Sequence, residues 1–284
     1  MAKIAILTPD PADEGFHTRW RDVLAELSAP LKARGHEVSG PNWTDAALGR
    51  FDLVLPLLAW GYHRAGGAWD GETHAWERQG VPVQNAPSVL RWNADKAYLG
   101  RLGSAGAPII PTLFTDRLTL DELDKAARRF GTDRLIAKPR ISAGAWQTIR
   151  WSPGAPISDG PSGPAMIQPY LSAIERSGEV SLIYLAGAFS HAIRKVPQPG
   201  DFRVQPEYQG IINAYDPAPD EHGAAEAALA AVEERLLFAR VDLVRDAADR
   251  PLLMEMELVE PDLYLRYDPA SATRFADAVE AALG

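Results

Sequence analysis

The chain has 284 residues, of which 46% are hydrophobic and 24% are charged, and its formal net charge is −9. These values are typical of a globular protein, and the length predicts two or three lobes rather than one core. The acidic balance and the lack of a long apolar run argue against nucleic acid or a membrane as partner. No cysteine is present, which excludes disulfides, thiolate metal sites and cysteine nucleophiles. We therefore expect a soluble, cytoplasmic protein.

The first 90 residues alternate strand-like and helix-like segments. Lys3–Leu7 is a short apolar run that predicts a buried strand. Trp20–Leu31 repeats apolar residues at helical spacing, with a kink or break expected at Pro30. The other segments are strands at His36–Val38 and Phe51–Leu58 and a helix around His74–Gln79. This alternation predicts a small parallel α/β lobe over residues 1–90.

A second lobe is predicted over residues 91–168. A helix at Pro87–Leu102 leads into it, and Thr119 and Glu122 form a capping box that opens another helix. Leu135–Pro139 predicts a strand that carries a lysine at its end. The remaining predictions are a strand at Ile109–Leu113 and a surface loop, rich in proline, glycine and serine, at Trp151–Pro164.

Residues 169–284 predict a third lobe that is built on antiparallel sheet. A tight turn at Ala186-Gly187 joins two strands, and a second hairpin joins Val241–Arg245 to Leu252–Val259. The other segments are strands at Met166–Leu171, Glu179–Leu185 and Ala188–Val196, and helices from about Glu221 to Phe238 and from Ser271 to Leu283. The chain as a whole therefore predicts an α/β lobe followed by two α+β lobes.

The second hairpin carries acidic residues within apolar strands. In PLLMEMELVEP, alternation puts Glu255 and Glu257 on one face and Leu252, Met254, Met256 and Leu258 on the other. An antiparallel pairing brings Asp242 of the partner strand onto the face of the two glutamates. Three carboxylates so close repel one another unless water or a cation screens them. Such oxygen ligands suit Mg²⁺ or Mn²⁺; the alternative is that the glutamates line the wet face of a half-exposed sheet.

Two lysines and a stretch of small residues are candidates for phosphate binding. Lys138 ends an apolar strand shortly before a loop that contains Ser142 and Gly144. A lysine at a strand end can hold phosphate oxygens together with the backbone N–H groups of such a loop. Lys96, on the helix that follows the first lobe, is the second candidate. Taken alone, each lysine is more commonly a solvated surface residue.

The ordered series of these segments resembles the ATP-grasp superfamily of carboxylate–amine ligases. The series is RWNADK, LIAKP, MIQPYL, GEVSLIYLAG, HAIRKV, DFR, VDLV and MEMELVEP, and it spans nearly the whole chain. The superfamily includes glutathione synthetase, D-alanine–D-alanine ligase and the RimK-type enzymes. Within it, WGYH, LRWNADKAYL and EPDLYLRYDP are similar to the cyclo-ligase of cycloserine biosynthesis. The resemblance implies an ATP-grasp fold that holds ATP between antiparallel sheets.

The resemblance also implies roles for individual residues. It places Lys96 and Lys138 on the ATP phosphates, with Ser142 and Gly144 in the phosphate loop, and Arg194 and Arg203 on the γ-phosphate and the acyl phosphate. The hinge that binds adenine corresponds to Gln168, Pro169, Tyr170 and Leu171, and the acid that binds ribose to Glu179, with Glu175 near enough to compete. Asp242, Glu255 and Glu257 correspond to the magnesium ligands, although relatives usually have asparagine at the position of Glu257.

The substrate is expected between the first lobe and the ATP site. Tyr62 and His63, in the WGYH motif, are the candidate contacts from the first lobe. Glu260 follows the acidic strand and faces either the substrate or solvent. The likeness to the cyclo-ligase implies a small amino-acid-like substrate whose amine and carboxyl end join. The sequence leaves open whether they join within one molecule or between two, and a homodimer is expected only by analogy with relatives.

The predicted activity is that of an ATP-dependent carboxylate–amine ligase that works through an acyl phosphate, with ATP and Mg²⁺ (or Mn²⁺). Such phosphoryl transfer depends on positioning and charge neutralisation, so no side-chain nucleophile is required. A Rossmann-type dehydrogenase is not favoured, because Thr8-Pro9-Asp10-Pro11 stands where its glycine-rich loop belongs. The alternative is a non-catalytic ATP-binding or sensing protein on the same fold. The presence of Lys96, Lys138, Asp242 and Glu255 argues against it.

Overall fold

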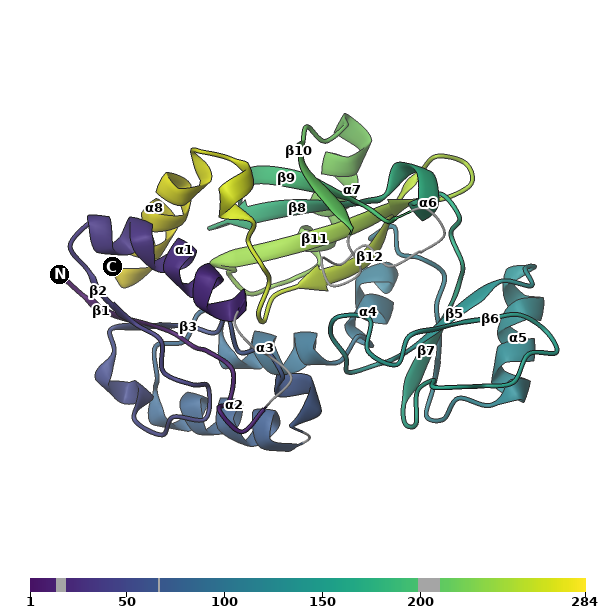
Figure 1. Ribbon diagram of the computed structural model, residues 1–284, viewed down its shortest axis with the longest axis horizontal. Helices are drawn as coiled ribbons and strands as arrows, with labels where there is room; N and C mark the ends of the chain where they lie inside the picture. Colours follow the sequence, from purple (N-terminus) through teal and green to yellow (C-terminus); the bar gives the residue numbers. More distant parts are fainter. Residues whose placement is uncertain (14–18, 66, 199–209) are drawn as a thin grey trace.

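Three sheets with helices around them make up the computed structural model (Figure 1), which describes residues 1–13, 19–65, 67–198 and 210–284. Its α-helices are α1 (Arg19–Ala33), α2 (Gly67–Gln79), α3 (Pro87–Ala94), α4 (Tyr98–Ser104), α5 (Leu120–Phe130), α6 (Ile174–Ser177), α7 (Pro219–Ala230) and α8 (Ser271–Leu283). Its strands are β1 (Lys3–Ile6), β2 (Glu37–Ser39), β3 (Leu53–Leu55), β4 (Leu113–Thr115), β5 (Leu135–Pro139), β6 (Ile149–Trp151), β7 (Ala165–Pro169), β8 (Glu179–Leu185), β9 (Ala188–Val196), β10 (Ile211–Tyr215), β11 (Phe238–Arg245) and β12 (Pro251–Glu257). Among the residues described, no helix combines the length and apolar character needed to cross a membrane.

The first sheet is parallel and has the strand order β2-β1-β3. Because side chains alternate along a strand, Ile4 and Ile6 of β1 join the apolar cluster of α1 and α8. Ala5 and Leu7 join the other cluster, which contains Trp69 of α2. Figure 1 shows α1 and α8 next to each other on one side of this sheet and α2 on the other. The last helix of the chain therefore helps to cover the first sheet.

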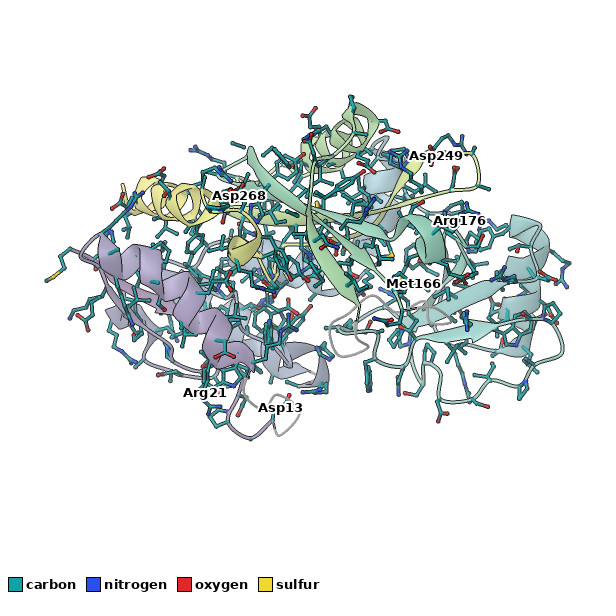
Figure 2. All side chains as sticks on the ribbon, turned by 45° about the horizontal axis from the view of Figure 1, so that its top comes forward. Asp13, Arg21, Met166, Arg176, Asp249 and Asp268 are labelled. Carbon is teal, nitrogen blue, oxygen red and sulfur yellow. The ribbon has the colours of Figure 1, made fainter. Side chains whose placement is uncertain are left out.

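The second sheet, which we call the lid sheet, is antiparallel and has the order β4-β7-β5-β6. Helix α5 covers one face, where Leu123 packs in a cluster with Leu135 and Ala137. Lys138 of β5 has the opposite alternation and pairs in register with Met166 of β7. Met166 is buried in the core of the third sheet, and Figure 2 shows it between the two parts of the molecule. The uncovered face of the lid sheet thus meets the third sheet.

The third sheet is antiparallel, has the order β10-β9-β8-β11-β12, and has two different faces. The outer face, which includes Val180 and Leu243, packs against α3, α4 and α7. The opposite, inner face is apolar near α8, where Phe238 joins the cluster of the first lobe. Further along, the inner face carries Ser181, Arg240 and Asp242, all buried. A parallel sheet followed by two antiparallel sheets confirms the predicted α/β and α+β fold class.

Most predicted elements are confirmed, and several departures have a local cause. The helix expected over Pro87–Leu102 divides into α3 and α4, because Asp95 is extended and its side chain accepts the N–H of Ala97 at 2.9 Å. Helix α1 continues through Pro30 to Ala33, so the predicted break is absent. The helix expected to reach Phe238 ends at Ala230, and β6 and β10 were not predicted. The exact lobe boundaries stay a prediction.

A bulge in the acidic hairpin changes the predicted alternation. Asp242 pairs with Glu255, but the next pair is Leu243 with Leu253, so Met254 is the extra residue. Leu253 therefore packs in the core with Met256 and Leu258, in the place predicted for Met254. The prediction that Leu252 and Met254 share a face with Met256 and Leu258 is wrong for this reason.

Candidate active site between the lid sheet and the third sheet

The hairpin of β11 and β12 brings the predicted carboxylates to the inner face of the third sheet. Asp242 stands in register opposite Glu255, and Glu257 stands opposite Arg240. Asp242 accepts hydrogen bonds from Ser181 Oγ at 2.5 Å and from Arg240 Nε at 3.0 Å. Arg240 also pairs with Glu257. A buried guanidinium is thus shared between two of the three acids.

Two lysines approach the same acids from the lid side. Lys96 is buried, and its Nζ lies 3.0 Å from Glu255 Oε1 and donates to the carbonyl of Ser142. Burial lowers the pKa of Lys138, the nearby Glu255 opposes this, and Lys96 adds to it. Lys138 therefore lies within electrostatic reach of Lys96 and Glu255. The structure brings together the two predicted phosphate lysines and the predicted metal ligands.

A buried ion pair on β8 and β9 extends this group of charges. Lys195 Nζ lies 2.5 Å from Glu179 Oε1 and 3.8 Å from Asp242 Oδ1. Burial raises the pKa of Glu179, and the attraction of Lys195 opposes the rise. We call the whole set the charge cluster; it consists of Lys96, Lys138, Glu179, Lys195, Arg240, Asp242, Glu255 and Glu257. Its members come from the α3–α4 junction, the lid sheet and the third sheet.

The pKa values of the acids follow from their partners. Burial acts to raise the pKa of Asp242, but Arg240 and Lys195 outweigh it and lower that pKa to about 2. Burial opposes the ionised form of Glu255 as well, yet Lys96 and Lys138 lower its pKa. Burial raises the pKa of Glu257 to about 7, because the attraction of Arg240 offsets only part of the penalty. Asp242 and Glu255 are therefore the firmly ionised members.

The donor set fits a hard divalent cation at two of the three predicted positions. Asp242 and Glu255 are ionised oxygen ligands that face each other, which suits Mg²⁺. Glu257 is engaged by Arg240 and is the weaker candidate. Within the described residues, no group of three acids or histidines forms a closed cage, because lysine and arginine side chains lie between the carboxylates.

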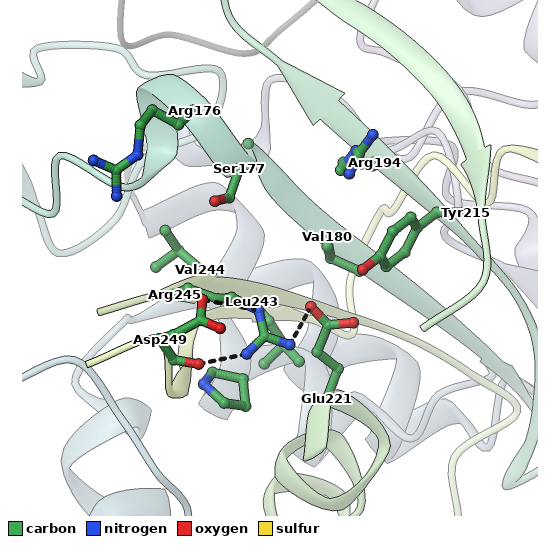
Figure 3. Close-up of a pocket in the computed structure, with 12 residues that line it drawn as sticks. Arg176, Ser177, Val180, Arg194, Tyr215, Glu221, Leu243, Val244, Arg245 and Asp249 are labelled. Carbon is green, nitrogen blue, oxygen red and sulfur yellow. Dashed lines mark hydrogen bonds and ion pairs between the residues drawn. The ribbon is translucent and has the colours of Figure 1, made fainter. Parts of the chain in front are cut away.

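The two predicted arginines do not join the charge cluster. Arg194 is exposed and lies on the outer face, because its neighbour Lys195 occupies the inner face and side chains alternate. Figure 3 shows Arg194 beside Tyr215, where its guanidinium lies 5.2 Å from the ring centroid, in a hollow that also contains Arg245 and Glu221. Arg203 lies outside the described residues.

The hinge residues lie at the end of β7, where the chain leaves the lid sheet. Gln168 is buried and its Nε2 donates to Thr112 Oγ1 at 2.9 Å. After Pro169, the N–H of Tyr170 donates to the carbonyl of Arg134 at 2.8 Å, and Leu171 follows. The Tyr170 hydroxyl and the Glu175 carboxylate are hydrogen-bonded. Two acids are candidates for binding ribose. Glu179 lies in the charge cluster, and Glu175 is hydrogen-bonded to Tyr170 of the hinge.

The predicted phosphate loop is anchored where it leaves β5. Lys96 N–H donates to the carbonyl of Arg140 at 2.9 Å, and Arg140 pairs with Asp95. Gly144 has a φ of 61°, a left-handed turn conformation that glycine adopts more readily than other residues. Beyond it, the ring of Trp146 lies 6.3 Å from that of His63, so the loop reaches the first lobe.

The predicted substrate residues line the first-lobe side of the site. Tyr62 is buried, and His63 carries a buried Nδ1 for which the described residues offer no hydrogen-bond partner. Burial, with help from Arg64 and Lys96, lowers the pKa of His63 to about 4, so the ring is neutral at pH 7. Burial and the nearby Glu257 raise the pKa of Glu260 to about 8. These groups therefore offer neutral hydrogen-bonding partners beside the charge cluster.

Two cations of the charge cluster, Lys195 and Arg240, were missed in the sequence. Their positions in the strands could have indicated them. Arg240 stands two residues before Asp242 on one strand, so both side chains lie on the same face. Lys195 stands directly after Arg194, and only the strand register decides which of the two faces inward. The alternation of small and apolar residues in β9 was too weak to fix that register.

Comparison with known proteins gives relatives of known activity. No family model matches the chain. The cycloserine biosynthesis protein DcsG of Streptomyces lavendulae is 33% identical over 211 residues, which cover 67% of this chain and 70% of that protein. The crystal structure of D-cycloserine synthetase DcsG superposes with a TM-score of 0.82 at 25% identity, covering 99% of this chain and 100% of that one.

More distant structures share the fold. The D-alanine–D-alanine ligase of Bacillus anthracis has a TM-score of 0.69 at 15% identity, covering 100% of this chain and 96% of that one. The ATP-grasp ligase PsnB, complexed with a minimal precursor, has a TM-score of 0.66 at 17% identity, covering 98% and 99%. At this level of identity, the likeness concerns the fold alone.

Proposed function

The chain belongs to the ATP-grasp superfamily of carboxylate–amine ligases, and from this premise we propose that it closes a ring within a small amino-acid-like substrate. Membership makes it an ATP-dependent enzyme that forms a C–N bond, and relatives have been solved with ATP and with Mg and ADP. The ring closure rests on the likeness to the D-cycloserine synthetase, which extends over 99% of the chain.

The charge cluster is the observation that supports the ATP-dependent chemistry of the proposal. Its two phosphate-binding lysines, Lys96 and Lys138, approach from the lid side, and Lys195 and Arg240 come from the third sheet. ATP carries its charge on the phosphates, so a site that transfers the γ-phosphoryl group needs several fixed cations around it. Four cations, from the α3–α4 junction and the two sheets, supply them, and the hinge at Gln168–Leu171 is proposed to bind adenine.

The first step uses these cations for charge neutralisation. A carboxylate oxygen of the substrate attacks the γ-phosphorus, and the bond to the bridging oxygen breaks, which gives an acyl phosphate and ADP. Lys138, Lys195 and Arg240 are proposed to hold the transferred group, and Lys96 the neighbouring phosphate oxygens. Asp242 and Glu255 would hold Mg²⁺, which would supply further charge neutralisation for this transfer.

The second step forms the amide. The amine nitrogen attacks the acyl carbon, the C–O bond to phosphate breaks, and the nitrogen loses a proton. Tyr62, His63 and Glu260 are proposed to contact the substrate on the first-lobe side. His63 is neutral at pH 7, so it can accept or donate a hydrogen bond without adding charge. That Mn²⁺ replaces Mg²⁺, and that the chain is a homodimer, are further predictions.

The proposal is tested by ADP release from Mg·ATP across a panel of small amino acids that carry both a carboxyl group and a distal nitrogen nucleophile. We expect release with a cyclic product of the substrate's mass less water, dependent on Mg²⁺. A linear product of two substrate molecules would show that joining is intermolecular. ATP binding, seen as a raised melting temperature, without release for any substrate would contradict the proposal and favour a sensing protein.

A further inference from the structure

Tyr264 is a buried residue in a backbone conformation that tyrosine rarely adopts. It is 5% exposed and has φ 51° and ψ 37°, in the left-handed region. The Cβ of a non-glycine residue crowds the backbone in this conformation, which glycine adopts freely. The N–H of Tyr264 donates to Asp262 Oδ1 at 2.8 Å, and Asp262 pairs with Arg266 at 3.0 Å. Asp262 therefore holds the backbone of Tyr264 in this conformation. Because glycine would fit it more easily, the tyrosine side chain is expected to have a role.

The ring of Tyr264 lies against two cations of the charge cluster. Its centroid is 5.5 Å from Lys195 Nζ and 5.7 Å from Arg240 Cζ. Both cations are nearly inaccessible, at 4% and 7% exposure. Lys195 pairs with Glu179 and approaches Asp242, and Arg240 binds Asp242 and Glu257, so one ring contacts both cationic partners of Asp242.

We propose that Tyr264 is a positioning residue whose aromatic face holds Lys195 and Arg240 in place for the phosphoryl group that is transferred. This rests on the proposed function. A buried ammonium or guanidinium has lost its water, and the negative face of an aromatic ring replaces part of that stabilisation without an acceptor that would compete with phosphate. A small displacement of such cations lowers transition-state stabilisation more than ground-state binding.

The first test changes the electronic character of the ring and leaves its shape alone. Phenylalanine, and then phenylalanines with one, two and three ring fluorines, are incorporated at position 264 in the full-length protein. Each fluorine withdraws charge from the ring face, so we expect kcat for ADP release to fall stepwise, by roughly tenfold in total, while KM for ATP changes little. Tyr264→Phe should keep near wild-type kcat, because the ring and not the hydroxyl carries the role. Equal kcat across the fluorinated series, or a loss already in Tyr264→Phe, would overturn the proposal.

The second test removes the ring. Tyr264→Leu should lower kcat by about tenfold or more, since both cations lose their support. Tyr267→Leu is the matched control: its ring packs edge-on against Tyr264 with centroids 6.0 Å apart and contacts Arg266 at 5.1 Å, as Tyr264 also does, but in the described part of the chain it contacts no member of the charge cluster. A loss of kcat that is the same in both variants would mean a structural role only.

The assays also separate this inference from the proposed function. The dissociation constant for Mg·ATP is measured by titration calorimetry on each variant, whether or not a substrate has been found. Wild-type protein that binds Mg·ATP but releases no ADP with any substrate would refute the proposed function. Wild-type turnover with a fluorinated series of unchanged kcat would refute the role of Tyr264 alone.

Discussion

The two faces of the third sheet carry similar charges in different surroundings. On the inner face, Lys195 and Asp242 are almost fully buried within the charge cluster. On the outer face, Arg245 pairs with Asp220 at 2.9 Å, and the Asp220 side chain is 50% exposed. Exposed pairs contribute little to stability and cost little to form, whereas buried pairs lose much of their attraction to desolvation.

This difference indicates which charges the fold retains for chemistry. Replacing a buried ion pair by packed apolar residues is often neutral or stabilising, so stability alone does not explain a cluster in which five charged side chains are buried. The outer-face pairs need no such explanation, because water screens them. The predictions below test the contrast, beginning with neighbouring residues on β9 that face opposite ways.

The largest effect is expected from Lys195→Met. It leaves Glu179 and Asp242 buried beside each other without their shared cation, so the free energy of unfolding should fall by about 3–5 kcal/mol. Any folded fraction should have kcat lowered by about 100-fold or more, as for loss of one transition-state donor. Urea unfolding and single-turnover ADP release measure the two effects.

Arg194→Met is the matched control, one residue away on the outer face. Its guanidinium lies over Tyr215, and no described carboxylate pairs with it. Stability should change by less than about 0.5 kcal/mol, and kcat should stay within twofold. A large loss of kcat in Arg194→Met would show that this arginine reaches the site after all, as the sequence predicted, and would break the contrast between the faces.

Glu255→Gln is expected to separate activity from stability. The glutamine keeps the size of the side chain and can still accept a hydrogen bond from Lys96, but it loses the charge that attracts Mg²⁺. We expect kcat to fall by about 100-fold with a change in melting temperature of only a few degrees. Glu226→Gln, at an exposed position of α7 on the outer side, should leave both unchanged. Full activity in Glu255→Gln would exclude this residue as a metal ligand.

The raised pKa of Glu260 predicts a loss of stability as pH rises. Burial lifts it from 4.5 to about 8, so between these values the folded state binds a proton that the unfolded state has lost. The stabilisation is complete below about pH 4.5 and is lost as pH rises through 8, at up to about 1.4 kcal/mol per pH unit. Glu257, with a pKa of about 7, acts in the same direction.

Glu260→Gln should therefore flatten the dependence of unfolding free energy on pH between 5 and 8.5. Asp242 makes stability depend on pH in the opposite direction and at lower pH. Its pKa is lowered from 3.8 to about 2, so its contribution to stability is lost as pH falls through that range. Urea unfolding at several pH values measures both windows. An unchanged slope in Glu260→Gln would show that this carboxyl is ionised and hydrated in the folded protein.

The sequence predicts the strands better than the faces they present. The positions of Asp242, Glu255 and Glu257 in short apolar runs are enough to predict that acids meet on one hairpin, and the register of Asp242 with Glu255 confirms that these two do. The bulge at Met254 and the inward turn of Lys195 in place of Arg194 depend on pairing with other strands. A shift of one residue moves every side chain to the other face, and no local pattern fixes it.

The smallest effect is expected from Asp220→Asn on the outer face. Asp220 accepts two hydrogen bonds from Arg245, at 2.9 and 3.0 Å. These hydrogen bonds lower the pKa of Asp220. It is half exposed, so losing its charge should cost only about 0–1 kcal/mol, and kcat should not change. Glu221, its neighbour, is nearly buried, pairs with the same arginine at 3.1 Å and accepts the N–H of Ala218 at 2.9 Å.

Glu221→Gln should therefore cost more than Asp220→Asn, by about 1 kcal/mol, although both acids contact one guanidinium. Urea unfolding of the two variants in low and in high salt separates the causes: salt should weaken only the contribution of Asp220. Equal costs would mean that burial does not set the strength of these pairs. The contrast between the buried charges of the inner face and the exposed charges of the outer face would then lose its physical basis.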